Sequence, residues 1–196
     1  MGLLLGDPGS AGHQSGPPSI WVQRFTGLIR PGGTVLDLAC GGGRHLRWLA
    51  TQGYAVTGVD RDAAALDSLR GDSGELIVAD LEAAPWPLPG RRFDGIVVTN
   101  YLWRALWPEL RTALAESGVL IYETFADGQQ SVGKPARPEF LLQPGELLRA
   151  CAGLRVVAFE DGFEAAVPRF VQRIAAVNEA PGQQRAARYS LPEPGG

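Results

Sequence analysis

The chain has 196 residues, of which 45% are hydrophobic, and it carries a formal net charge of −3 at pH 7 with a pI near 5.4. This length is typical of one domain with a substantial core. The acidic balance argues against a broad basic surface for nucleic acid, although a local basic groove stays open. The two cysteines, Cys40 and Cys151, indicate neither a disulfide framework nor a zinc motif, so we expect a reduced, cytoplasmic protein without a metal site.

The two ends of the chain differ in composition from the middle. Residues 1–18 hold one short leucine run and no basic stretch, which predicts neither a signal peptide nor a membrane span. Residues 180–196 are polar and rich in Gly and Pro, as unpacked tails are. We therefore predict a flexible leader over 1–18, one domain over 19–179 and a flexible tail over 180–196.

The first half of this domain alternates short apolar runs with amphipathic ones. That alternation is typical of βαβ units, which build parallel sheets. The expected elements are strands over 33–39, 55–60 and 75–80 and helices over 43–52 and 61–70.

The second half continues the pattern and ends differently. The link between its last two strands is too short for a parallel crossover, so they are expected to form an antiparallel pair. We predict an α/β fold with a doubly wound, Rossmann-like sheet of seven strands, mostly parallel with an antiparallel strand near one edge. The expected elements are strands over 93–100, 118–125, 154–161 and 169–177, helices over 102–116 and 144–152, and a long connection over 126–143.

A glycine-rich loop, "ACGGGRH", separates the first strand from the first helix of the βαβ unit. Such a loop lets a ligand approach bare backbone, and the helix N-terminus favours an anion. A dinucleotide fingerprint needs a third glycine where Leu46 stands, and no Gly-Lys-Ser/Thr follows for a nucleoside triphosphate loop. A tight turn without a ligand is the plainer alternative.

Acidic residues end the next two strands. Asp60 can accept hydrogen bonds from ribose hydroxyls, or it can cap the following helix, for which Asp62 is better placed. Asp80 can accept from the exocyclic amine of an adenine while Leu81 offers its backbone amide. The carboxyl ends of parallel strands meet at one edge of a sheet, so the sequence predicts a nucleoside-sized site there.

Four segments in order, "VLDLACGGGRH", "VTGVDRD", "VADLEAAPW" and "FDGIVVTNYLWR", resemble the motifs of class I S-adenosylmethionine-dependent methyltransferases. The resemblance covers about residues 21–177, with Ala39 where the first glycine is most usual. "GYAVTGVDRD" and the short chain are similar to small tellurite-resistance and thiopurine-type methyltransferases. The resemblance implies that S-adenosylmethionine is held by Asp37, Ala39, Gly41, Gly43, Asp60, Arg61, Asp80, Leu81 and Asn100.

The same resemblance places the methyl acceptor beyond the fourth and fifth strands. Glu123 is expected as a general base or as the cap of a turn. Trp103 and Trp107 are expected to serve packing, with contact to the sulfonium as the alternative. "TNYL" lacks the two prolines of enzymes that methylate nucleobase amines, so we predict a small-molecule acceptor. The alternatives are a protein or RNA acceptor, an NAD- or nucleotide-binding oxidoreductase, and a cofactor-binding partner without catalysis. The candidate catalytic residues are Asn100, Tyr101, Arg104 and Glu123.

The segment Phe125–Leu147 leaves the ligand-binding edge of the predicted sheet and contains several glycines and prolines. We expect it to contain a mobile lid, with a disordered insertion as the alternative. The apolar residues 140–142 suggest that part of it packs, and Lys134 and Arg137 are expected to face the acceptor. No catalytic role is expected for His45 or Cys40.

Overall fold

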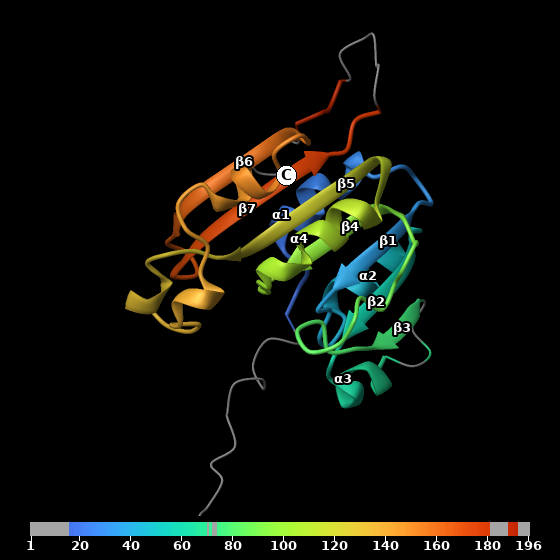
Figure 1. Ribbon diagram of the computed structural model, residues 1–196, viewed down its shortest axis with the longest axis horizontal. Helices are drawn as coiled ribbons and strands as arrows, with labels where there is room; N and C mark the ends of the chain where they lie inside the picture. The colour runs from blue at the N-terminus through green and yellow to red at the C-terminus, as the bar shows by residue number, and fades with distance from the viewer. Residues whose placement is uncertain (1–15, 70, 72–73, 181–187, 192–196) are drawn as a thin grey trace, which may run out of the picture.

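The computed structural model describes residues 16–69, 71, 74–180 and 188–191 (Figure 1). Most of the predicted leader, residues 1–15, and most of the predicted tail, residues 181–187 and 192–196, lie outside the described residues. Within the tail, Tyr189 packs against a core cluster and its hydroxyl donates to Glu179 Oε1 at 3.1 Å.

One sheet of seven strands, in the order β3-β2-β1-β4-β5-β7-β6, organises the molecule. The five strands from β1 to β5 pair in parallel, and β7 pairs antiparallel with both β5 and β6. The predicted fold class is therefore confirmed. The strands are β1 (Thr34–Leu38), β2 (Ala55–Asp60), β3 (Glu75–Val78), β4 (Phe93–Thr99), β5 (Leu114–Phe125), β6 (Arg155–Glu164) and β7 (Arg169–Val177).

Helices cover both faces of the sheet. The central strands carry apolar side chains on both faces, and each face must be shielded from water. Val35 of β1 packs with residues of α1 (Ile20–Phe25) and α2 (Arg44–Thr51), whereas Leu36 packs with residues of α4 (Trp107–Ala113) and α5 (Glu146–Ala150). The short α3 (Ala63–Asp67) follows β2, and Leu66 packs against Cys40. Short 3-10 turns η1 to η4 complete the fold at Thr26–Leu28, Arg104–Leu106, Gln129–Ser131 and Pro138–Phe140.

The predicted helix over 102–116 is wrong at its end. α4 stops at Ala113, and the backbone at Leu114 is already extended and pairs with Phe93 of β4. Leu114 is buried, so pairing and burial in the sheet override the helical pattern of this stretch. β5 consequently begins four residues earlier than the sequence predicts.

The long connection after β5 is fastened to the sheet edge. Ala126 and Leu142 form an isolated parallel bridge, and Asp127 N donates to Leu142 O at 2.8 Å. Leu141 and Leu142 are fully buried, as the apolar run predicts. Between residues 16 and 191, apart from the gaps given above, no helix has the length and apolar character needed to cross a bilayer.

Candidate active site

The glycine loop after β1 is a tight turn built on left-handed backbone. Ala39, Gly41 and Gly43 have φ angles of 53°, 52° and 71°. A Cβ on Gly43 would lie 2.6 Å from Leu69 Cδ1, so both conformation and space require glycine there. Gly41 N donates to Asp60 Oδ2 at 2.7 Å, which ties this loop to the tip of β2.

Asp37 of β1 comes shortly before this loop in the chain. Its side chain is 1% exposed, and Oδ2 has no hydrogen-bond donor among the described residues. Burial raises the pKa of Asp37 to about 7, opposed by the backbone N–H of Leu46 and the charge of Arg44. An acceptor atom that is buried without a donor is costly, so the arrangement favours a bound group that supplies one.

The two strand-end acids hold their own loops. Asp60 also accepts from Asp62 N at 2.9 Å, and Asp62, not Asp60, caps α3. Asp80 Oδ1 accepts from two amides of the following turn. A carboxylate has about four lone-pair sites, so both acids can accept further hydrogen bonds. Arg61 is exposed beside Asp60, and the side chain of Leu81 is buried in the core.

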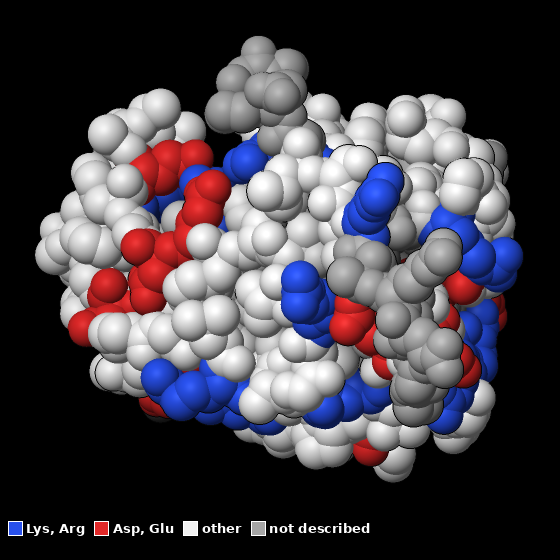
Figure 2. All heavy atoms as spheres, turned by 90° about the horizontal axis from the view of Figure 1, so that it is seen from above, with Lys and Arg blue, Asp and Glu red and all other residues white. Residues whose placement is uncertain are grey.

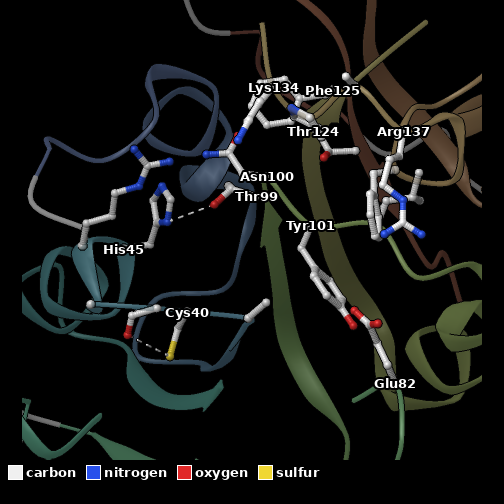
Figure 3. A pocket seen from close by; sticks show the side chains of 18 residues that line it. Cys40, His45, Glu82, Thr99, Asn100, Tyr101, Thr124, Phe125, Lys134 and Arg137 are labelled. Atoms are coloured by element: carbon white, nitrogen blue, oxygen red, sulfur yellow. Dashed lines mark hydrogen bonds between the residues drawn. The ribbon is translucent and has the colours of Figure 1, made fainter. Parts of the chain in front are cut away.

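A pocket of about 550 Å³ opens at the carboxyl edge of the sheet, between the tips of β1, β4 and β5 and the long connection (Figure 3). Its lining carries both charges: Glu82 lies beside Tyr101, and the cations Lys134 and Arg137 come from the connection. The predicted residues that line the pocket are Ala39, Gly41, Asn100 and Tyr101, joined by Cys40, Gly42, Arg44, His45, Glu82, Thr99, Leu102, Thr124, Phe125, Lys134, Pro135, Ala136, Arg137 and Phe140.

Two polar side chains at the tip of β4 face this pocket without partners. Asn100 Oδ1 and the Tyr101 hydroxyl are buried and have no hydrogen bond among the described residues. Asn100 adopts a left-handed φ of 54°, a conformation that asparagine tolerates better than most residues. Burial, and next the charge of Glu82, raise the pKa of Tyr101, so its hydroxyl is a neutral donor.

His45, which has no predicted role, is an ordered part of the pocket wall. Its Nε2 accepts from Ser19 N at 3.0 Å, and Nδ1 lies 3.4 Å from Thr99 Oγ1. Burial, reinforced by the charge of Arg44, lowers the pKa of His45 to about 3. The ring is therefore neutral near pH 7, and because Nε2 accepts, the proton is assigned to Nδ1.

The carboxylate of Glu123, near the end of β5, is hydrogen-bonded to other protein groups. Its side chain is 1% exposed, Oε1 accepts from Ser19 Oγ at 3.0 Å, and Oε2 accepts from Arg173 at 3.1 Å. Arg169 lies 3.5 Å from the same carboxylate, and Glu123 does not line the pocket. These contacts support an anchoring role, not the expected roles of general base or turn cap.

Arg104 lies outside the pocket as well. It pairs with Glu146 at 2.7 Å and donates to the carbonyl oxygens of Glu139 and Leu141, so it fastens the long connection to α5. Trp107 stacks on Tyr122 with ring centroids 5.1 Å apart, which agrees with the packing that we expect for it. Trp103 is partly exposed and does not line the pocket.

The cysteines behave as small core residues. Cys40 and Cys151 are both free and buried. Burial raises the pKa of the Cys40 thiol, and the carboxylates of Asp37 and Asp60 raise it further. The thiol is therefore protonated and poorly nucleophilic near pH 7, as the sequence leads us to expect.

Comparison with known proteins places this site in context. Residues 35–119 match a protein family described as "Methyltransferase domain". No curated protein matches the chain at a significant level.

Solved structures share the fold. TehB from Haemophilus influenzae has a TM-score of 0.63 and 20% identity over 79% of this chain, which spans 60% of the length of that one. A SAM-dependent methyltransferase from Aquifex aeolicus has a TM-score of 0.60 and 19% identity over 81% of this chain and 89% of that one. The glycopeptide N-methyltransferase MtfA, complexed with S-adenosylhomocysteine, has a TM-score of 0.57 and 20% identity over 80% of this chain and 87% of that one.

Proposed function

We propose that this chain is a class I S-adenosylmethionine-dependent methyltransferase and that its methyl acceptor is a small molecule. The family match over residues 35–119 and the shared fold support the first part of the proposal. The observation that carries the proposal is the pocket of about 550 Å³. Its size is within the range of small-molecule sites. The connection that follows β5 bounds it on one side, and the acceptor shares it with the methionine end of the cofactor, which favours a small acceptor.

The residues of the glycine loop fit a zwitterionic amino acid such as the methionine end of the cofactor. Asp37 Oδ2 is buried without a donor, and an ammonium group supplies one. Arg44 lines the pocket, and burial lowers its pKa, opposed by the charges of Glu123 and Asp37. We infer that Asp37 binds the ammonium group and Arg44 the carboxylate.

The remaining cofactor contacts follow the strand tips. Asp60 and Asp80 keep lone pairs for the ribose hydroxyls and the adenine amine, and the amide of Leu81 serves the adenine ring. Tyr101 faces the acidic end of the pocket beside Glu82 (Figure 3), so we assign it to the cofactor side. Asn100 Oδ1 is unpartnered at the tip of β4, and we assign it to the orientation of the acceptor.

The bound cofactor supplies an activated methyl group, so the protein contributes mainly by holding two reactants in line, an effect of about 7–11 kcal/mol in favourable cases. Thr99 and Asn100 at the tip of β4 and Thr124 at that of β5 bound the space where the acceptor enters. The surface gives little support to an RNA acceptor. On the face shown in Figure 2, basic side chains form separate groups among acidic and uncharged ones, and the net charge is −3.

Calorimetric titration with S-adenosylhomocysteine and, separately, with NAD tests the cofactor. Binding of the first without the second is expected, whereas the reverse would support the oxidoreductase. Transfer of a labelled methyl group from S-adenosylmethionine is then compared for pools of small nucleophiles, RNA and protein. Label that enters only RNA or protein would refute the small-molecule acceptor.

A further inference from the structure

The connection after β5 brings two cationic side chains to the pocket, Lys134 and Arg137 (Figure 3). Lys134 is the single lysine in the whole sequence; every other basic residue of the Lys and Arg class is arginine. In Figure 3, Lys134 lies beside Phe125 and away from Glu82, whereas Arg137 lies between Lys134 and Glu82. Glu82 is the one acidic residue among the described residues that line the pocket. The pocket is therefore basic where the acceptor is expected to enter.

The backbone that carries these two cations is fixed from both sides. Gln129, only 4% exposed, donates from Nε2 to Lys134 O at 3.1 Å and accepts from Phe170 N at 2.9 Å. Beyond Arg137, the carbonyl oxygen of Glu139 accepts from Arg104 at 2.7 Å. A buried glutamine and a paired arginine thus hold a stretch whose side chains are themselves exposed, which reduces the entropy lost when a ligand binds.

Neither cation is neutralised by a strong internal partner. Arg137 pairs with Glu139 at 3.2 Å, but their side chains are 71% and 59% exposed, and such pairs contribute little. Lys134 makes no ion pair within residues 16–180 as far as the structure describes them. Two cations that line one pocket raise the local concentration of anions there and can hold them by charge-assisted hydrogen bonds.

We propose that the methyl acceptor carries an anionic group, a carboxylate or a phosphate, that binds to Lys134 and Arg137. This inference rests on the proposed function, because it identifies the chemical class of the acceptor in the same pocket. It assigns Lys134 and Arg137 to the recognition of the acceptor, whereas Asp37 and Arg44 bind the cofactor. The two pairs of residues can therefore be tested separately.

The single lysine allows a direct test. The intact protein, saturated with S-adenosylhomocysteine, is acetylated with an N-hydroxysuccinimide ester, and modification of Lys134 is followed by peptide mapping. Phenyl phosphate and benzoate are the anionic probes, and benzyl alcohol at equal ionic strength is the neutral control. We expect both anions to slow the acetylation of Lys134 at least threefold and benzyl alcohol to leave it unchanged.

Variants test whether the charge of Lys134 is responsible for anion binding. Lys134→Gln should weaken phenyl phosphate binding at least fivefold in calorimetry and leave S-adenosylhomocysteine affinity within twofold, whereas Lys134→Arg should retain most of the phenyl phosphate affinity. Arg92→Gln removes the same charge from an exposed position that does not line the pocket and should have no effect.

Equal protection by all three probes, protection by none, or unchanged phenyl phosphate affinity in Lys134→Gln would overturn the assignment. A failure of S-adenosylhomocysteine to bind would instead count against the proposed function. In that case the same acetylation, carried out without S-adenosylhomocysteine, still decides whether anions bind at Lys134.

Discussion

The contact between Ser19 and His45 joins the entry to α1 with the pocket wall, and a pair of substitutions can isolate it. The Ser19 hydroxyl accepts from Trp21 N and donates to Glu123. Ser19→Ala removes this hydroxyl but keeps the backbone N–H, which donates to His45 Nε2. Ser19→Pro removes the hydroxyl and the N–H together. Ser19 has φ −55°, which a proline ring adopts without strain.

The expected magnitudes follow from these contacts. Loss of the cap costs about 1 kcal/mol, and loss of a hydrogen bond to a charged carboxylate about 1.5–3 kcal/mol, so Ser19→Ala should be destabilised by about 2–4 kcal/mol. Ser19→Pro additionally leaves the buried Nε2 of His45 without a donor, at about 1–3 kcal/mol. Proline also restricts the unfolded chain, which stabilises the folded state by about 0.4–1 kcal/mol. The proline variant should therefore be less stable than the alanine variant by about 1.3 kcal/mol at the middle of these ranges, and by about 2.6 kcal/mol at most.

Urea denaturation at about pH 7.5, followed by far-UV circular dichroism, measures both variants. His45 variants provide an independent check: Gln at this position can still present an acceptor to Ser19 N, whereas Asn is shorter and cannot reach it. His45→Gln should therefore be the more stable of the two. Equal stability of Ser19→Pro and Ser19→Ala, together with equal stability of the two His45 variants, would refute the proposed contribution of this contact.

Three further predictions concern the glycine loop and its acids. Gly43→Ala should destabilise the fold by about 2–4 kcal/mol through left-handed strain and the clash with Leu69, whereas Gly32→Ala, with φ 68° and open space, should cost about 1–2 kcal/mol; equal losses in urea denaturation would contradict the steric argument. Burial raises the pKa of Asp37 to about 7, so folding takes up a proton between about pH 4 and 7 and wild-type stability falls as pH rises through that window. Asp37→Asn removes this dependence, and its stability relative to wild type should improve by at least about 1.4 kcal/mol between about pH 5 and pH 8; a parallel pH profile in the variant would exclude the raised pKa. Asp60→Ala should weaken S-adenosylhomocysteine binding by about 1.5–3 kcal/mol in calorimetry, and an affinity within twofold of the parent would remove the ribose assignment.

The fold could be predicted from the sequence because its signals are local. Apolar runs of strand length, glycines at turns and short links identify parallel strands and the final antiparallel pair without any knowledge of contacts. The boundary between α4 and β5 could not be predicted in this way. The stretch before Ser117 has a helical pattern, and only the pairing of Leu114 with Phe93 makes it a strand.

The residues of the candidate site that belong to a local sequence motif could be predicted. Contacts between residues that are far apart in the sequence could not. Ala39, Gly41 and Asn100 line the pocket as the motifs indicate. The contacts of Ser19 with His45 and Glu123 span 26 and 104 residues and have no local signal.

Glu123 illustrates a signal that was present and could be used. Arg169 and Arg173 lie four residues apart on the last strand and therefore face the same side of the sheet. The antiparallel pairing places Arg173 opposite Glu123. Once that register is known, an ion pair is a better interpretation of Glu123 than a general base, because the Glu123 side chain is buried and Arg173 lies 3.1 Å from it.

The titratable groups around the pocket bear on how the acceptor reacts. Burial raises the pKa of Cys40 and of Tyr101, so neither accepts a proton near pH 7. The free lone pair of His45 is already used by Ser19 N, and Glu123 is paired with arginines. Glu82, the one carboxylate among the described residues that line the pocket, lies beside Tyr101 on the side that we assign to the cofactor. We therefore expect catalysis by positioning, with an acceptor atom that is already nucleophilic or that loses its proton to water. The pH dependence of the rate should then follow the pKa of the acceptor and shift when acceptors of different acidity are compared; a profile that stays fixed across such a series would instead require a protein base.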